Sequence, residues 1–167
     1  MEIKLNLYNM KIYLLLLISF LIIQPVFAKC EPKSFNLTKE TDIMAKEILY
    51  TFVLNDLQMT PQEVENFAKI KPELVRAIKY DLNNDGEDEI IGIVYSTFYY
   101  GSSGYNLFIL QKKGYKYENI SSLQNIEPQE KIKILKSVTN GFCKIRLKSS
   151  YANKFKNYTI EYNDNSY

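Results

Sequence analysis

The chain has 167 residues, of which 46% are hydrophobic and 24% charged, and its formal net charge is +2. This composition excludes an intrinsically disordered chain and suffices for one globular domain with a core. The sequence contains no histidine, which excludes a Ser-His-Asp triad, a Cys-His dyad and a histidine-ligated zinc site. The nearly balanced charge indicates no particular class of partner.

Residues 1–28 have the layout of a secretory signal peptide. Lys4 and Lys11 precede a 12-residue apolar run at 12–23, and small residues lead up to Ala28. The run is shorter than the ~20 residues of a membrane span. We therefore expect cleavage after Ala28 rather than a retained anchor, and no stable membrane span after cleavage. The remaining residues, 29–167, are predicted to form a single domain that is periplasmic or secreted.

The mature chain keeps two cysteines, Cys30 and Cys143. Exported proteins enter an oxidising compartment, where cysteines pair. The sequence therefore predicts a Cys30–Cys143 disulfide, with two unpaired thiols as the alternative.

The first half of the domain predicts two helices after an extended arm at 29–38. Apolar residues spaced three and four apart predict a helix over 41–56 with one broad apolar face. Thr60, Pro61 and Glu63 form the sequence of a capping box with proline in the first turn. This second helix is expected to end near Ile70, because Pro72 follows.

Strand patterns begin at residue 75, and the segments 90–95 and 105–111 are apolar on both faces, as in central strands. Asn140-Gly141 predicts a tight hairpin between the segments 131–138 and 142–147. The expected fold is α+β, with two N-terminal helices packed on an antiparallel β-meander of about five or six strands.

The acidic segment 81–89 lies between two predicted strands. Its alternating side-chain oxygens, the turn at Gly86 and a later carboxylate suit a calcium loop, because Ca²⁺ prefers a cage of oxygen ligands. The alternative is a polar hairpin in which Asp and Asn cap their own backbone without an ion. The expected ligands are Asp81, Asn83, Asp85, Glu87 and Glu89, with Asp88 as the alternative to Glu89 for the closing carboxylate.

The pattern Asp-x-Asn-x-Asp-Gly before an apolar strand resembles the calcium loop of FG-GAP and VCBS-type segments. It resembles more closely a group of small exported bacterial proteins, in which an aromatic, glycine-rich turn and a second apolar strand follow. The resemblance covers about residues 75–120. It implies export and a non-enzymatic, β-rich domain, and it implies no substrate.

Tyr99, Tyr100 and Tyr105 flank a turn that contains Gly101 and Gly104. Tyrosines on a turn are good contacts for a protein partner or a glycan, since their rings are large and amphipathic. The alternative is that these rings pack against the sheet.

The charge is divided along the chain. Residues 29–110 carry 8 basic and 13 acidic side chains, whereas residues 111–167 carry 11 basic and 5 acidic ones. The basic half could bind an anionic polymer or a membrane surface, or its lysines could protect a sheet edge from aggregation. Export disfavours nucleic acid.

The expected function is that of a small exported, non-enzymatic binding protein of the inhibitor or immunity type, with a protein partner in the cell envelope or outside the cell. A calcium-dependent envelope or carbohydrate-binding module is the first alternative. A hydrolase with an unrecognised carboxylate site is the second.

Overall fold

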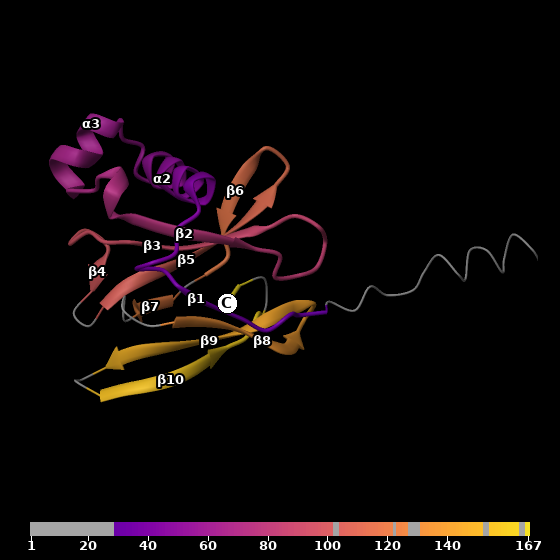
Figure 1. Cartoon of the computed structure of the whole chain (residues 1–167). Coiled ribbons are helices and arrows are strands. Elements are labelled where there is room, and N and C mark those ends of the chain that lie inside the picture. The colour runs from indigo at the N-terminus through magenta and orange to yellow at the C-terminus, as the bar shows by residue number, and fades with distance from the viewer. Residues whose placement is uncertain (1–28, 102–103, 122, 127–130, 152–153, 164–165) are drawn as a thin grey trace, which may run out of the picture.

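The strands form one antiparallel sheet in a computed structural model that describes residues 29–101, 104–121, 123–126, 131–151, 154–163 and 166–167 (Figure 1). The strand order is β1-β8-β9-β7-β5-β3-β2, with β10 paired to β9 and both β4 and β6 paired to β5. The strands are β1 Lys33–Asn36, β2 Val75–Tyr80, β3 Glu89–Val94, β4 Tyr100–Gly101, β5 Gly104–Lys113, β6 Lys116–Asn119, β7 Leu123–Ile126, β8 Lys131–Thr139, β9 Phe142–Tyr151 and β10 Lys154–Ile160.

The sheet bends back on itself, and three layers result: the helices, the β2-β3-β5 half and the β8–β10 half (Figure 1). One hydrophobic core lies between the helices and the first half, where Leu49 and Val53 meet Phe108 and Leu110. A second core lies between the two halves and includes Ile91, Ile109 and Ile145, among others. Strands β3 and β5 contribute to both cores, as their double-sided apolar pattern predicted.

The helical layer contains one regular helix, α2, at Ile43–Leu57. The Asp42 side chain caps it by accepting a hydrogen bond from the Ala45 N–H at 2.8 Å. The predicted capping box between Thr60 and Glu63 is confirmed, but it opens only a one-turn α3 at Pro61–Glu63. The chain continues as a π-helix, Val64–Ala68, and a 3₁₀ turn, Pro72–Leu74.

The predicted fold class is wrong, because the structure is mostly β and its strands do not form a meander. The prediction missed β1, β4 and β7, which have four residues or fewer. Strand β1 pairs with β8, and β7 lies between β5 and β9. Such short strands carry little periodicity of their own, and long-range pairing decides their conformation.

Two local predictions are confirmed. Asn140 and Gly141 have φ angles of 49° and 83°, so both occupy the left-handed region that a two-residue hairpin turn requires. Cys30 and Cys143 form a disulfide with a Cα–Cα distance of 5.6 Å. Since β1 follows Cys30 and Cys143 lies on β9, the bond fixes the start of the domain to the last third of the chain.

Candidate functional site

The acidic loop joins β2 to β3 and closes on itself through hydrogen bonds between side chains and backbone. The Asp81 carboxylate accepts from the N–H groups of Asp85 at 3.2 Å and Gly86 at 3.0 Å. Asn83 Oδ1 accepts from the Asp85 N–H at 3.1 Å, and Asp85 Oδ1 accepts from the Glu87 N–H at 2.8 Å. This pattern is that of the polar hairpin, in which Asp and Asn cap nearby backbone groups.

The two remaining predicted ligands have other partners. Glu87 Oε1 lies 2.8 Å from the Lys112 Nζ on β5. Glu89 is 2% exposed, and its carboxylate accepts from the Leu82 N–H at 2.8 Å and from the Gln111 amide at 3.3 Å. Glu87 is therefore directed to the protein surface and Glu89 to the interior.

The loop gathers Asp81, Asn83 and Asp85 at its centre. Within the described ranges, no group of three or more carboxylate or cysteine side chains is close enough to hold a metal ion. Calcium binding by this loop therefore stays a prediction.

Glu89 is a buried acid whose ionisation is disfavoured. Burial, with smaller contributions from the charges of Asp85 and Asp81, raises the pKa of its carboxyl to about 7, although the hydrogen bonds from the Leu82 N–H and the Gln111 amide oppose the shift. The neighbouring Gln111 Oε1 is buried without a hydrogen-bond partner. Protonation of Glu89 would place a donor beside this unpaired acceptor.

The described tyrosines of the predicted binding turn pack in two different layers. The Tyr99 ring lies 5.2 Å from that of Phe108, on the helix side of the sheet. The Tyr99 hydroxyl is buried without a hydrogen bond of good geometry, and burial together with the Asp56 carboxylate raises its pKa to about 12. Tyr105 packs 5.0 Å from Tyr95 on the other side of the sheet.

Tyr100 pairs with Tyr105 through the backbone of β4 and β5, while its side chain and residues 102–103 lie outside the described part. The one large apolar side chain of this segment that the structure shows as exposed is Phe98, at 54%. Since Tyr99 and Tyr105 face opposite layers, they form no common binding surface. These contacts favour packing roles, and partner binding by the turn stays a prediction.

A groove of about 790 Å³ lies between α2 and the β5–β6 hairpin. Met44, Ile48 and Phe52 line it from α2, at spacings of four residues, and Tyr115 and Tyr117 line it from the hairpin. Its volume falls in the range of small-ligand and peptide clefts, ~300–1,000 Å³. Half of the residues that line the groove are apolar or aromatic, and the other half are polar or charged.

The groove exists because α2 carries more apolar side chains than the sheet can cover. Leu49 and Val53 are fully buried against the sheet. Met44, on the same broad apolar face that the sequence predicted, is 61% exposed, and Ile48 and Phe52 are half-buried. The periodicity predicted one broad apolar face and did not separate its buried part from its exposed part. The excess apolar width of the helix was the available indication of the groove.

The helical wall of the groove is negatively charged. Glu47 and Asp56 line its α2 wall, against Lys116 on the hairpin. Between Glu40 and Glu73 the chain carries seven acidic side chains and three lysines. The groove is therefore a partly apolar site with an acidic helical wall and Lys116 on the hairpin wall.

Comparison with known proteins identifies no relative: no protein-family model, no curated protein and no solved structure matches this chain. None of the helices in the described residues is long and apolar enough to cross a membrane.

Proposed function

We propose that this chain is a small exported binding protein, of the inhibitor or immunity type, that holds a protein partner in the groove between α2 and the β5–β6 hairpin. The observation that carries the proposal is the exposure of large apolar side chains at one place: Met44 is 61% exposed and Tyr115 fully exposed, beside half-buried Ile48 and Phe52. Contiguous exposed apolar side chains mark interaction sites.

The acidic helical wall of the groove favours a partner with basic side chains. Glu47 and Asp56 form no salt bridge within the described residues. Complementary charge steers association and excludes wrong partners. The groove is therefore suited to a partner segment that places apolar side chains next to lysine or arginine.

A hydrolytic function has weaker support at this site. Glu47 and Asp56 are nine residues apart on one helix, so the helical rise separates them by about 13.5 Å. Carboxylate pairs that cleave glycosides lie about 5–9.5 Å apart. The chain also lacks histidine. These features favour binding without catalysis.

The test is site-specific photo-crosslinking with the mature chain in material from the exporting organism. A photoreactive residue replaces Thr51, which is exposed and lines the groove, or Gln62, which is exposed on α3. We expect a discrete protein product from position 51 that is absent from position 62. The Met44→Asp change should abolish this product without unfolding the chain, because Met44 is exposed. Identical products from both positions would refute the groove as the binding site.

Calcium is proposed as a structural ion of the acidic loop, in line with the sequence pattern. The support is the convergence of Asp81, Asn83 and Asp85, with no basic partner for Asp81 or Asp85 among the described ion pairs. Ca²⁺ at ~5 mM exceeds the weak extracellular range of binding constants and should raise the melting temperature by mass action. The Asp85→Ala variant should show no rise in melting temperature with Ca²⁺. If Ca²⁺ does not change the melting curve of the wild-type chain, the loop is an ion-free polar hairpin and the proposal is wrong.

A further inference from the structure

The outer face of β8 and β9 carries basic side chains that the groove does not explain. Lys131 and Lys133 on β8 are exposed, while the alternate residues Ile132 and Ile134 are buried in the core between the sheet halves. Arg146 on β9 is exposed and is the cross-strand partner of Lys133. Neighbouring strands lie about 4.8 Å apart and alternate residues about 6.8 Å apart. The three cations are therefore close neighbours on one face.

Their cross-strand neighbours do not neutralise them. Lys133 lies opposite Ser34 on β1, and Arg146 lies opposite Thr159 on β10. Lys131 lies opposite Asn36. The described ion pair of this half of the sheet joins Lys144 to Glu161 at 2.6 Å and involves none of the three. Like charges directly opposite one another on a sheet are destabilising, so this arrangement needs an explanation other than folding stability.

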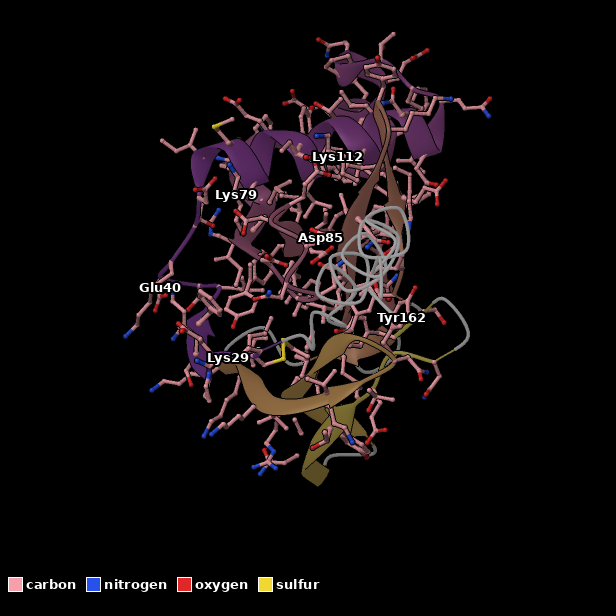
Figure 2. The ribbon with its side chains drawn as sticks, turned by 90° about the vertical axis from the view of Figure 1, so that its right-hand side faces the viewer. Lys29, Glu40, Lys79, Asp85, Lys112 and Tyr162 are labelled. Atoms are coloured by element: carbon pink, nitrogen blue, oxygen red, sulfur yellow. A yellow bond between two sulfur atoms is a disulfide. The ribbon has the colours of Figure 1, made fainter. Side chains whose placement is uncertain are left out.

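Protection of a sheet edge does not provide that explanation. Strand β8 is paired on both sides, with β1 and β9, and β9 is paired with β8 and β10. Lysines that prevent edge-to-edge aggregation stand on edge strands, whereas Lys131, Lys133 and Arg146 stand on the face of interior strands. Figure 2 shows nitrogen-tipped side chains gathered below β8 and β9, on the side away from α2 and near Lys29.

We infer that this basic face, defined by Lys131, Lys133 and Arg146, binds the anionic headgroups of a lipid bilayer. Two neighbouring strands, β8 and β9, spread the three charges in two dimensions, which suits a planar surface better than a single extended polymer. The exposed Lys29 is the predicted start of the mature chain, and the Cys30–Cys143 disulfide fixes this start to β9, the strand of Arg146. Five residues separate Lys29 from the apolar run at 12–23. If that run enters the membrane during export, this end of the domain is the one nearest the bilayer.

The experiment measures co-sedimentation of the mature chain with vesicles of phosphatidylcholine alone or with about 30% phosphatidylglycerol, at about 0.1 M salt. One variant carries Lys131→Gln, Lys133→Gln and Arg146→Gln. A matched control removes the same charge on the helical side and the hairpin, with Lys69→Gln, Lys71→Gln and Lys113→Gln. All six side chains are exposed, so circular dichroism should show both variants folded.

We expect the wild-type chain to bind the anionic vesicles and not the neutral ones. A basic residue close to an anionic membrane contributes about fivefold to binding, so the face variant should lose on the order of 100-fold. The control should lose far less, because its lysines lie away from the face. If both variants lose the same affinity for anionic vesicles, the binding depends only on net charge, and the inference is wrong. Absent vesicle binding would overturn it, as would binding to soluble heparin without binding to vesicles.

Discussion

At the scale of single residues, buried polar groups next to the acidic loop affect the stability of the fold. Glu89 is 2% exposed, its carboxylate accepts from the Leu82 N–H, and Cys143 donates its own N–H to the Leu82 carbonyl at 2.7 Å. The loop, the disulfide and the interior acid thus share one backbone segment. The sequence marked Glu89 as a metal ligand, because the residue lies in an acidic run. The sequence contains no direct indication that the side chain points inward, since that depends on the sheet half packed beneath it.

Glu89 should make the stability of the protein depend on pH. Its pKa is about 7 in the folded chain against 4.5 for an ordinary glutamate. Between these values the unfolded chain releases the proton and the folded chain retains it. The stabilising contribution is therefore complete below pH ~4.5, is lost as the pH rises through ~7, and amounts to on the order of 3 kcal/mol.

The Glu89→Gln variant, which cannot ionise, should unfold in urea at a midpoint that is nearly constant between pH 5 and pH 8, about the limits of this window. EDTA in all samples excludes effects of bound ions. Glu118→Gln, at an exposed position on β6, should keep the wild-type dependence. A Glu89→Gln variant with an unchanged decline in stability would show that another group is responsible.

At the scale of elements, the sequence predicted well the starts of those helices and strands that local interactions determine. Strand β2 begins at Val75, where the strand patterns were predicted to begin, and α2 begins two residues after the predicted start. The second helix was overestimated. Lys69 adopts a left-handed φ of 54° and ends the π-helix before Ile70. The groove was not predicted. The apolar width of α2 indicated excess apolar surface, but the second wall depends on how far β5 extends past β3, and hydrophobic periodicity contains no information about that.

The contact between α2 and β3 requires a glycine at position 92. A Cβ there would lie 2.5 Å from the Leu49 Cδ2 and 2.6 Å from the Arg76 carbonyl oxygen. The leucine can change rotamer, but the carbonyl belongs to the β2 backbone and moves only if the strand pairing is disturbed. We therefore expect Gly92→Ala to lower the free energy of unfolding by about 3 kcal/mol, at the upper end of overpacking costs.

Chemical denaturation of Gly92→Ala measures this cost, and Gly114→Ala is the matched control. Gly114 has φ of +61° with open space around it, so alanine there should cost only the ~1 kcal/mol of a left-handed residue. Equal losses in the two variants would mean that the helix layer moves away from the sheet at little cost.

At the scale of the whole molecule, the fold class was the part that the sequence did not yield. Strand β1 pairs with β8 across about a hundred residues of chain, and Ile126 on β7 pairs with Ser149 on β9. These pairings depend on which surfaces remain uncovered after the central strands form, and no local pattern encodes them. By contrast, the pairing of the two cysteines was predicted from their number and from the predicted export signal, without knowledge of the topology.

The disulfide should therefore contribute more to stability than any single side-chain contact at the start of the domain. Cys30 and Cys143 are separated by 113 positions, and closing a loop of that length restricts the unfolded chain by about 4–5 kcal/mol in the chain-entropy model. The Cys30→Ala and Cys143→Ala double variant should lose about 4 kcal/mol, seen as a fall in the urea midpoint with the native circular dichroism spectrum retained. Wild-type chain reduced with dithiothreitol keeps both buried sulfur atoms, which separates the crosslink from the packing of the side chains. If the reduced chain is as stable as the oxidised one, the bond does not restrict the unfolded state, and pairing of β1 with β8 alone holds the start of the domain in place.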